Sequence, residues 1–223
     1  VYFLRRLNMT DNKDSEIATN SDLIQKATEY IEPILEHLDT EDVVVEKEKI
    51  TELFVKLWEY EGGEKLDPPT QRLTVIALFI YTTHNVLEDH NIRIDRARQY
   101  ITDALHEWLK PEMEKTIAVE KASTNPFKAF VDSNQRDFDE VFRWEHFMPD
   151  VKKNNENELN FKLKKCWFAE FFIRFGRVDY IPTACEFDKI QWTARKDYVD
   201  LKLTNLFAKL GTLCQFKYTP AKE

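Results

Sequence analysis

The residues of this chain best suited to chemistry are its three cysteines, which all lie in the last third of the sequence. Cys166 stands four residues before Glu170, and Cys185 stands three residues before Asp188. Residues three or four apart share one face of a helix. A thiolate can attack an electrophilic carbon, and a carboxylate can transfer a proton. The spacing therefore indicates two thiol–carboxylate pairs that would act together if their helices pack side by side.

The cysteines allow two further interpretations. Buried free cysteine commonly behaves as a small apolar residue, so the thiols can serve packing alone. Alternatively Cys166, Cys185 and Cys214 could meet at a metal, with Asp188 as a fourth ligand. Their separations of 19 and 29 positions match no usual zinc pattern. We therefore expect no metal site and no cofactor.

Basic side chains are enriched in the same C-terminal segment of an otherwise acidic protein. They are Lys162, Lys164, Lys165, Arg174, Arg177, Lys202 and Lys209. Such residues can form a pocket for the carboxylate of a substrate. Lysines also protect the solvated edges of strands, and the sequence leaves both interpretations open.

Composition limits the classes of function. The formal net charge of −8 argues against a nucleic-acid partner. Only 4 of 223 residues are glycine, and no glycine-rich phosphate-binding motif occurs. The longest apolar stretch, residues 73–87, is shorter than the ~20 residues that span a bilayer. We expect a soluble cytoplasmic protein with reduced thiols, no membrane partner and a possible homo-oligomeric state.

The first two thirds of the chain show helical periodicity. Apolar residues recur at three- and four-residue steps from Leu23, and Gly62-Gly63 is expected to stop the second helix. We expect Thr70 to cap a third helix, Pro111 to end or bend a fourth, and Asn125 to cap a fifth. Residues 1–20 are expected to form a flexible tail.

The periodicity changes after a polar segment at 150–158, which is expected to be a loop. Alternation begins at Leu159 and returns at 199–204 and 213–218, which predicts an antiparallel sheet. The predicted fold class is α+β: an N-terminal helical bundle followed by a small antiparallel sheet with two short helices. Residues 21–223 are expected to form a single domain, helical over 21–150 and mixed α/β over 157–220.

Three motifs in residues 70–218 resemble the L-2-amino-thiazoline-4-carboxylic acid hydrolase family. A strand leads into Cys166, and Gly176 follows ten residues later. The family's C-x-x-D motif is matched by Cys185 and Asp188. The family's ending, R-T-x-T-[LI]-A-x-G-x-x-x-C-D-F, is matched at Thr204, Ala208, Cys214 and Phe216.

The chain departs from that ending at several positions. Leu203 stands at the arginine position, Leu206 at the second threonine, Leu210 at the glycine and Gln215 at the aspartate. A glycine, Gly211, follows one place later. The arginine and the aspartate are charged groups suited to substrate binding or proton transfer, so the resemblance supports the fold further than it supports the substrate.

The resemblance implies a hydrolase that opens the ring of a 2-aminothiazoline-4-carboxylate-like cyclic amidine to a carbamoyl-cysteine. Under it, Glu170 and Asp188 are the candidates for proton transfer, and Cys166 or Cys185 is the nucleophile if the path is covalent. Substrate-binding candidates are Arg177, Lys202, Thr204 and Cys214. The alternative is a non-catalytic protein that binds a small molecule on the same fold.

Overall fold

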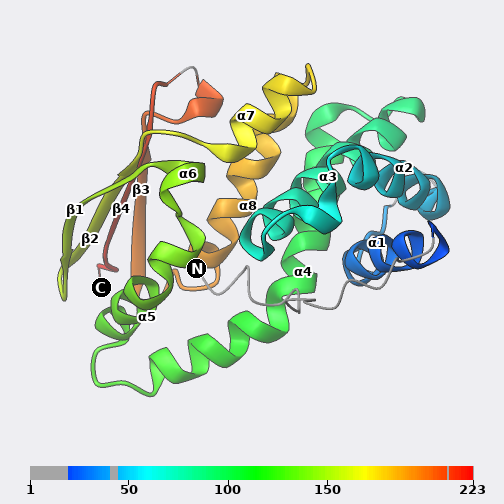
Figure 1. The fold of residues 1–223 in the computed structure, drawn as a ribbon. Coiled ribbons are helices and arrows are strands. Elements are labelled where there is room, and N and C mark those ends of the chain that lie inside the picture. Colours follow the sequence, from blue (N-terminus) through cyan, green and yellow to red (C-terminus); the bar gives the residue numbers. More distant parts are fainter. Residues whose placement is uncertain (1–19, 41–44, 210, 223) are drawn as a thin grey trace. The chain divides into compact units, whose positions relative to one another are not determined.

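The computed structural model describes residues 20–40, 45–209 and 211–222. The described chain divides into two compact units, one formed by residues up to 108 and the other by residues from 109 onward. We call them the helical unit and the sheet unit, and each is described by itself (Figure 1). The expected tail lies outside the described residues, except for Asn20, and the expected single domain stays a prediction.

The helical unit contains α1 (Asn20–Leu35), α2 (Lys47–Tyr60), the 3-10 turn η2 (Gly63–Lys65), α3 (Pro68–Asp89) and the first part of α4 (Ile94–Lys121). The third helix is buried nearly all round, with Ile76, Leu78 and Phe79 fully inside. An all-round apolar helix is typical of a core helix. The periodicity of the sequence therefore located the centre of this unit.

One expectation about a helix end is wrong, one is excluded in part and one is confirmed. Asp67, not Thr70, caps α3: its carboxylate accepts hydrogen bonds from the Thr70 amide and hydroxyl at 3.5 and 2.6 Å. Pro68 fits the first turn because proline needs no amide partner there. Pro111 does not end α4, which runs on to Lys121. Gly62 stops α2 as expected, with a left-handed φ of 66°.

The sheet unit contains the rest of α4, then α5 (Pro126–Val141), α6 (Trp144–Phe147), β1 (Pro149–Asn155), β2 (Glu158–Leu163), α7 (Trp167–Arg174), η3 (Val178–Tyr180), α8 (Ile181–Thr193), β3 (Val199–Thr204), η4 (Phe207–Lys209) and β4 (Cys214–Pro220). The four strands form an antiparallel sheet in the order β1-β2-β4-β3. The α+β class predicted from the sequence is thus confirmed.

The polar segment expected to be a loop is largely the strand β1. It pairs with β2 from Pro149↔Leu163 to Asn155↔Glu158, with a bulge between Val151 and Lys153. Strands are therefore not confined to residues after 157. The strand lies at the sheet edge and is mostly exposed, so its sequence needs no apolar alternation.

One face of the sheet is apolar and aromatic. Phe161 and Phe216 stack at 5.0 Å between ring centroids, and helix α5 adds Phe130 against Tyr218 and Phe138 against Phe161. Asn125 caps α5, as expected: its side-chain oxygen accepts a hydrogen bond from the Lys128 amide at 2.9 Å. The core of the sheet unit lies on this face, where α5 contacts β1 and α8 contacts β3 (Figure 1).

Candidate functional site

Cys166 lies at the N-cap of α7, in the short connection between strand β2 and this helix. Its backbone is extended (φ −135°, ψ 110°), and its carbonyl accepts a hydrogen bond from the Glu170 amide at 3.1 Å. The thiol is half-buried. The expected four-residue relation between Cys166 and Glu170 is present, although Cys166 precedes the helix. A helix N-terminus carries partial positive charge, which stabilises a thiolate.

Glu170 lies in the first turn of α7 and faces solvent. Its side chain is 55% exposed, and its carboxylate pairs with the Lys165 ammonium at 3.1 Å. Lys165 also donates to the carbonyl of Glu145 at 2.8 Å, which holds the lysine between α6 and α7. A proton-transfer role for Glu170 therefore requires a substrate that binds at the surface of α7.

His146 is a candidate that the sequence interpretation missed. Backbone hydrogen bonds from Lys164 to Met148 and from Lys165 to Phe147 (3.3 and 3.1 Å) tie the end of α6 to the start of α7. The buried His146 ring thereby meets the ring of Trp167, with centroids 6.4 Å apart. Nothing in the spacing predicts this meeting. We call His146, Lys165, Cys166 and Glu170 the α6–α7 junction.

The second thiol–carboxylate pair lies on α8, which packs against α7. Phe187 of α8 meets Phe168 of α7 edge to face, with ring centroids 6.3 Å apart. Cys185 is half-buried. The side chain of Asp188 lies outside the described part of the structure. The two helices that carry the candidate pairs are thus neighbours, as the expected convergence requires.

Arg177 follows α7 and already has partners. Its guanidinium donates to the Asp179 carboxylate through Nε at 3.2 Å and Nη2 at 2.9 Å. It also lies 3.7 Å from the centroid of the Tyr180 ring, a cation–π contact. A substrate carboxylate would have to share or displace Asp179 to reach this guanidinium.

The sheet separates the remaining candidates between its two faces. Lys202 and Thr204 pair with Lys217 and Gln215 in the register of β3 and β4, on the polar face. Cys214 is buried on the opposite, aromatic face beside Leu163. Successive side chains of a strand point to opposite faces. Lys202 and Thr204 can therefore serve one ligand, but Cys214 does not lie on their face.

Cys214 has a structural contact of its own. Its sulfur accepts a hydrogen bond from the Phe207 amide at 3.5 Å, which fastens the connection between β3 and β4 to the sheet. The three cysteines form no disulfide with one another. Packing and loop anchoring thus account for this thiol, while Cys166 and Cys185 remain half-buried.

The polar face of the sheet is rich in lysine but electrostatically balanced near Glu158. The Glu158 carboxylate lies 3.3 Å from the ammonium groups of both Lys153 and Lys217. A hydrogen bond from Asn160, then those from Lys153 and Lys217, hold the pKa of Glu158 below its usual value. Lys202 forms no ion pair within the described chain and stands directly opposite Lys217. Lys202 is therefore placed to meet an added anion.

Two departures from the family-like ending can be placed in the sheet. Leu203 lies opposite Phe216 on the aromatic face. Gln215 lies on the polar face, where its amide donates to Asn160 at 3.3 Å. An uncharged chain thus replaces a charged one on each face, and neither leaves an unpaired charge behind. A substrate site that needed those charges must obtain them from other residues.

A buried ionic cluster ties α4 to the segment before β3. Arg195 donates to both oxygens of Glu120 at 2.7 and 3.1 Å, and the Tyr198 hydroxyl donates to the same carboxylate at 2.5 Å. The Gln191 side chain accepts from Arg195 at 2.6 Å. The charged side chains are only 1% and 3% exposed. Because both charges are paired within the cluster, it needs no ligand to neutralise them.

No group of three or more histidine, cysteine, aspartate or glutamate side chains within the described residues is arranged to hold a metal ion. A search of the same residues finds no helix long and apolar enough to cross a membrane.

The fold and the site define an α+β protein with a cysteine-bearing helix pair beside a four-stranded antiparallel sheet. The chain belongs to the L-2-amino-thiazoline-4-carboxylic acid hydrolase family, whose model matches residues 75–218. That range includes most of α3, the whole of α4 and nearly all of the sheet unit. Comparisons with curated proteins and with solved structures find no match.

Proposed function

We propose that this protein hydrolyses a small cyclic amidine, with 2-aminothiazoline-4-carboxylate as the model substrate and a carbamoyl-cysteine as the product. The observation that carries this proposal is membership of the hydrolase family over residues 75–218, which contain both thiol–carboxylate pairs. The family supports a hydrolase that acts on carbon–nitrogen bonds. The particular ring and product are part of the proposal.

The reaction begins with addition of water to C2, the ring carbon between sulfur and nitrogen. A base takes one proton of the water as the new carbon–oxygen bond forms. The resulting tetrahedral carbon then releases either the ring sulfur or the ring nitrogen, which an acid protonates. The sum is substrate plus one water, so no oxidant or other reactant is needed.

The α6–α7 junction is the first place to seek these groups. In a covalent path, the Cys166 thiolate attacks C2, and water later displaces it. The position of Cys166 at the N-terminal end of α7, where a helix carries partial positive charge, supports a thiolate there. Glu170 or the adjacent His146 would move the protons. Cys185 and Asp188 on the neighbouring helix α8 are the alternative pair for the same roles.

The substrate carboxylate needs a cation, and two are available. Lys202 presents its ammonium on the polar face of the sheet, with Thr204 two residues away on the same face, which is the face opposite the one that α8 contacts. Arg177 offers a guanidinium that Asp179 already holds. A carboxylate bound by arginine gains two parallel hydrogen bonds, whereas lysine acts as a point charge. Cys214 would contribute only from the aromatic side of the sheet.

The experiment that tests these roles is a kinetic comparison of single variants on 2-aminothiazoline-4-carboxylate. Glu170→Gln and Asp188→Asn should keep the fold and lower kcat by about 10²–10⁴-fold for the residue that transfers the proton. Cys166→Ser and Cys185→Ser identify the nucleophile, since a covalent path collapses and direct water attack persists in part.

The matched control is Glu186→Gln, which removes a carboxylate from α8 that pairs at the surface with Lys189 at 2.6 Å. Its kcat should stay within about twofold of the unchanged protein, since surface pairs contribute little. If Glu186→Gln lowers kcat as much as Glu170→Gln and Asp188→Asn do, those carboxylates have no special role.

A second candidate function is binding without hydrolysis on the same fold. Two observations favour it: Glu170 is exposed and paired with Lys165, and Leu203 and Gln215 replace charged residues of the family-like ending. Calorimetry separates the two functions. Saturable binding of 2-aminothiazoline-4-carboxylate without product formation would support the binding protein, and turnover would exclude it.

A further inference from the structure

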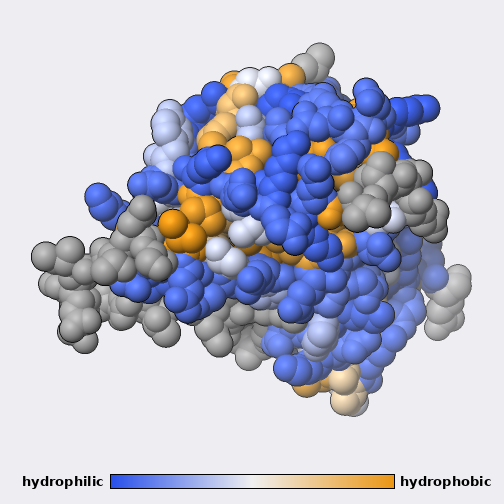
Figure 2. Space-filling model, turned by 90° about the vertical axis from the view of Figure 1, so that its right-hand side faces the viewer, coloured by the Kyte–Doolittle hydropathy of each residue, from blue (hydrophilic) through white to orange (hydrophobic). Residues whose placement is uncertain are grey.

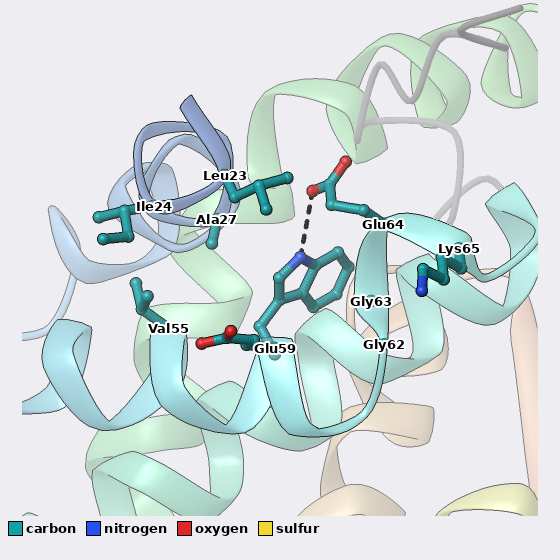
Figure 3. Close-up of a pocket in the computed structure, with 10 residues that line it drawn as sticks. Leu23, Ile24, Ala27, Val55, Glu59, Gly62, Gly63, Glu64 and Lys65 are labelled. Atoms are coloured by element: carbon teal, nitrogen blue, oxygen red, sulfur yellow. Dashed lines mark hydrogen bonds between the residues drawn. The ribbon is translucent and has the colours of Figure 1, made fainter. Parts of the chain in front are cut away.

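The helical unit contains a cavity far from the candidate residues in sequence. It has a volume of about 370 Å3 and lies between α1, α2 and the η2 turn (Figure 3). Its described lining is mainly apolar on the side of α1 and α2, and comprises Leu23, Ile24, Ala27, Val55, Trp58, Glu59, Gly62, Gly63, Glu64 and Lys65. This size lies within the range of small-molecule sites in proteins.

The wall formed by the η2 turn is held in place by side-chain packing. A Cβ on Gly63 would lie 2.1 Å from the Trp58 ring, so the glycine lets the turn sit directly against the indole. The Gly63 carbonyl accepts a hydrogen bond from the side-chain amide of the buried Gln71 at 2.8 Å. The Trp58 indole N–H donates to Glu64 at 3.1 Å. The cavity is therefore built into the fold before any ligand arrives.

The charged groups of the described lining are two carboxylates, Glu59 and Glu64, and one ammonium, Lys65. The indole N–H is used by one Glu64 oxygen, while Oε2 of Glu64 accepts no hydrogen bond from the described chain. Figure 3 shows Glu59 and Glu64 on the side of the α1 and α2 side chains, whereas Lys65 extends beyond Gly63. Two carboxylates thus lie on the apolar side of the lining, and the ammonium of Lys65 lies beyond Gly63.

Apolar and acidic side chains also lie close to this cavity. Figure 2 views the side of the molecule on which α1 and α2 lie in Figure 1, and shows hydrophobic groups gathered between hydrophilic ones. Ile24 is 46% exposed at the cavity. Burial, then the negative charges of Glu64 and Glu29, raise the pKa of Tyr30 to about 12, and its ring lies 5.1 Å from that of Trp58.

We propose that this cavity binds a small organic cation with an apolar body, such as an aryl- or alkylammonium. The apolar part would lie against Leu23, Ile24 and Val55, and the cationic head would meet the free oxygen of Glu64. A carboxylate next to an aromatic and aliphatic wall suits such a cation, whereas an anion would be repelled. The site lies outside the family-matched residues 75–218 and is independent of the proposed hydrolysis.

Calorimetric titration of the full chain with benzyltrimethylammonium tests the proposal. Phenylacetate carries the same ring with the opposite charge, and benzyl alcohol carries no charge. The cation should bind saturably at one site. Phenylacetate and benzyl alcohol should each bind at least about tenfold more weakly, because neither is attracted to the Glu64 carboxylate by a positive charge. Equal affinity for the three compounds, or no binding of the cation at millimolar concentration, would overturn the proposal.

The variant that locates the site is Glu64→Gln, which keeps an oxygen for the Trp58 N–H and removes the charge. It should weaken binding of the cation about fivefold or more without lowering the midpoint of urea unfolding. Glu52→Gln removes an exposed charge from α2 outside the cavity and should leave the affinity unchanged. An equal loss in both variants would show that overall charge, and not this cavity, attracts the cation.

Discussion

Glu120 and Arg195 place two opposite charges in the interior of the sheet unit. Removing only one of these charges is predicted to lower the free energy of unfolding. Glu120→Gln leaves the Arg195 charge without its partner at a site where the side chain is 3% exposed. Breaking a buried pair in this way destabilises a protein by about 3–5 kcal/mol. Urea denaturation of the variant should show a loss of that size in the free energy of unfolding.

The control for this prediction is the exposed pair between Lys121 and Asp197, whose side chains are 48% and 57% accessible. Asp197→Asn should cost less than about 1 kcal/mol. The double variant Glu120→Leu with Arg195→Met should recover much of the lost stability because it removes both charges. A Glu120→Gln protein as stable as Asp197→Asn would contradict the importance of the buried pair.

Tyr198 gives the same cluster a pH dependence. Burial, followed by the hydrogen bond to Glu120 and the charge of that carboxylate, raises the pKa of Tyr198 above its ordinary value of 10. The unfolded chain therefore loses the phenolic proton first as pH rises. The contribution of Tyr198 to stability is full below pH 10 and declines above it, by at most about 1.4 kcal/mol per pH unit.

Denaturation at pH 9, 10 and 11 checks this sign. The free energy of unfolding of the unchanged protein should fall more steeply above pH 10 than that of Tyr198→Phe, which cannot ionise. Parallel pH profiles for the two proteins would show that Tyr198 titrates in the folded state as it does in the unfolded chain.

At the residue scale, the sequence predicts local spacing better than it predicts the partners of side chains. The spacing of Cys166 and Glu170 was sufficient to place them one helical turn apart, because that relation is local. The pairing of Glu170 with Lys165, and the meeting of His146 with Trp167, depend on how α6 and α7 join. The contact between Glu120 and Arg195 spans 75 positions and has no local signal.

At the element scale, the connection between β3 and β4 depends on one glycine. A Cβ on Gly211 would lie 2.4 Å from the carbonyl oxygen of Asn205, which is backbone and cannot swing away. The Gly211 amide also donates to the Leu206 carbonyl at 3.0 Å. Gly211→Ala is therefore expected to lower the free energy of unfolding by about 1–3 kcal/mol through overpacking.

The matched substitution is Gly176→Ala, at a position with φ of 70° and no atom within 4 Å of the added Cβ. It should cost about 1–2 kcal/mol from backbone strain alone, with no displacement of neighbouring residues. The two variants differ in a second readout. Only Gly211→Ala should shift the amide NMR signals of Asn205 and Leu206 strongly, and unchanged signals there would refute the close contact.

The elements themselves were predictable where the periodicity is strong. Leu73 to Leu87 identified α3, and the change of period at Leu159 identified β2. Pro111 does not end α4, although it removes one backbone hydrogen bond, because the flanking residues Trp108 and Met113 are well buried. The strand β1 carried no signal, since an exposed edge strand is defined by pairing and not by apolar alternation.

At the scale of the whole molecule, the family covers the sheet unit and only part of the helical unit. The candidate thiol–carboxylate pairs lie inside the match, and the acidic cavity lies outside it. The two sites therefore make separate predictions. Variants of the cavity should leave hydrolysis unchanged, and variants of α7 and α8 should leave cation binding unchanged.

The most direct test of the central claim is incubation of the purified protein with 2-aminothiazoline-4-carboxylate, with the product identified by mass spectrometry and free thiol measured in parallel. The account predicts a carbamoyl-cysteine one water heavier than the substrate, formed at a rate that Glu170→Gln or Asp188→Asn sharply lowers. Absence of any product from thiazoline or other cyclic amidine rings, with the protein folded, would contradict the assignment as a hydrolase.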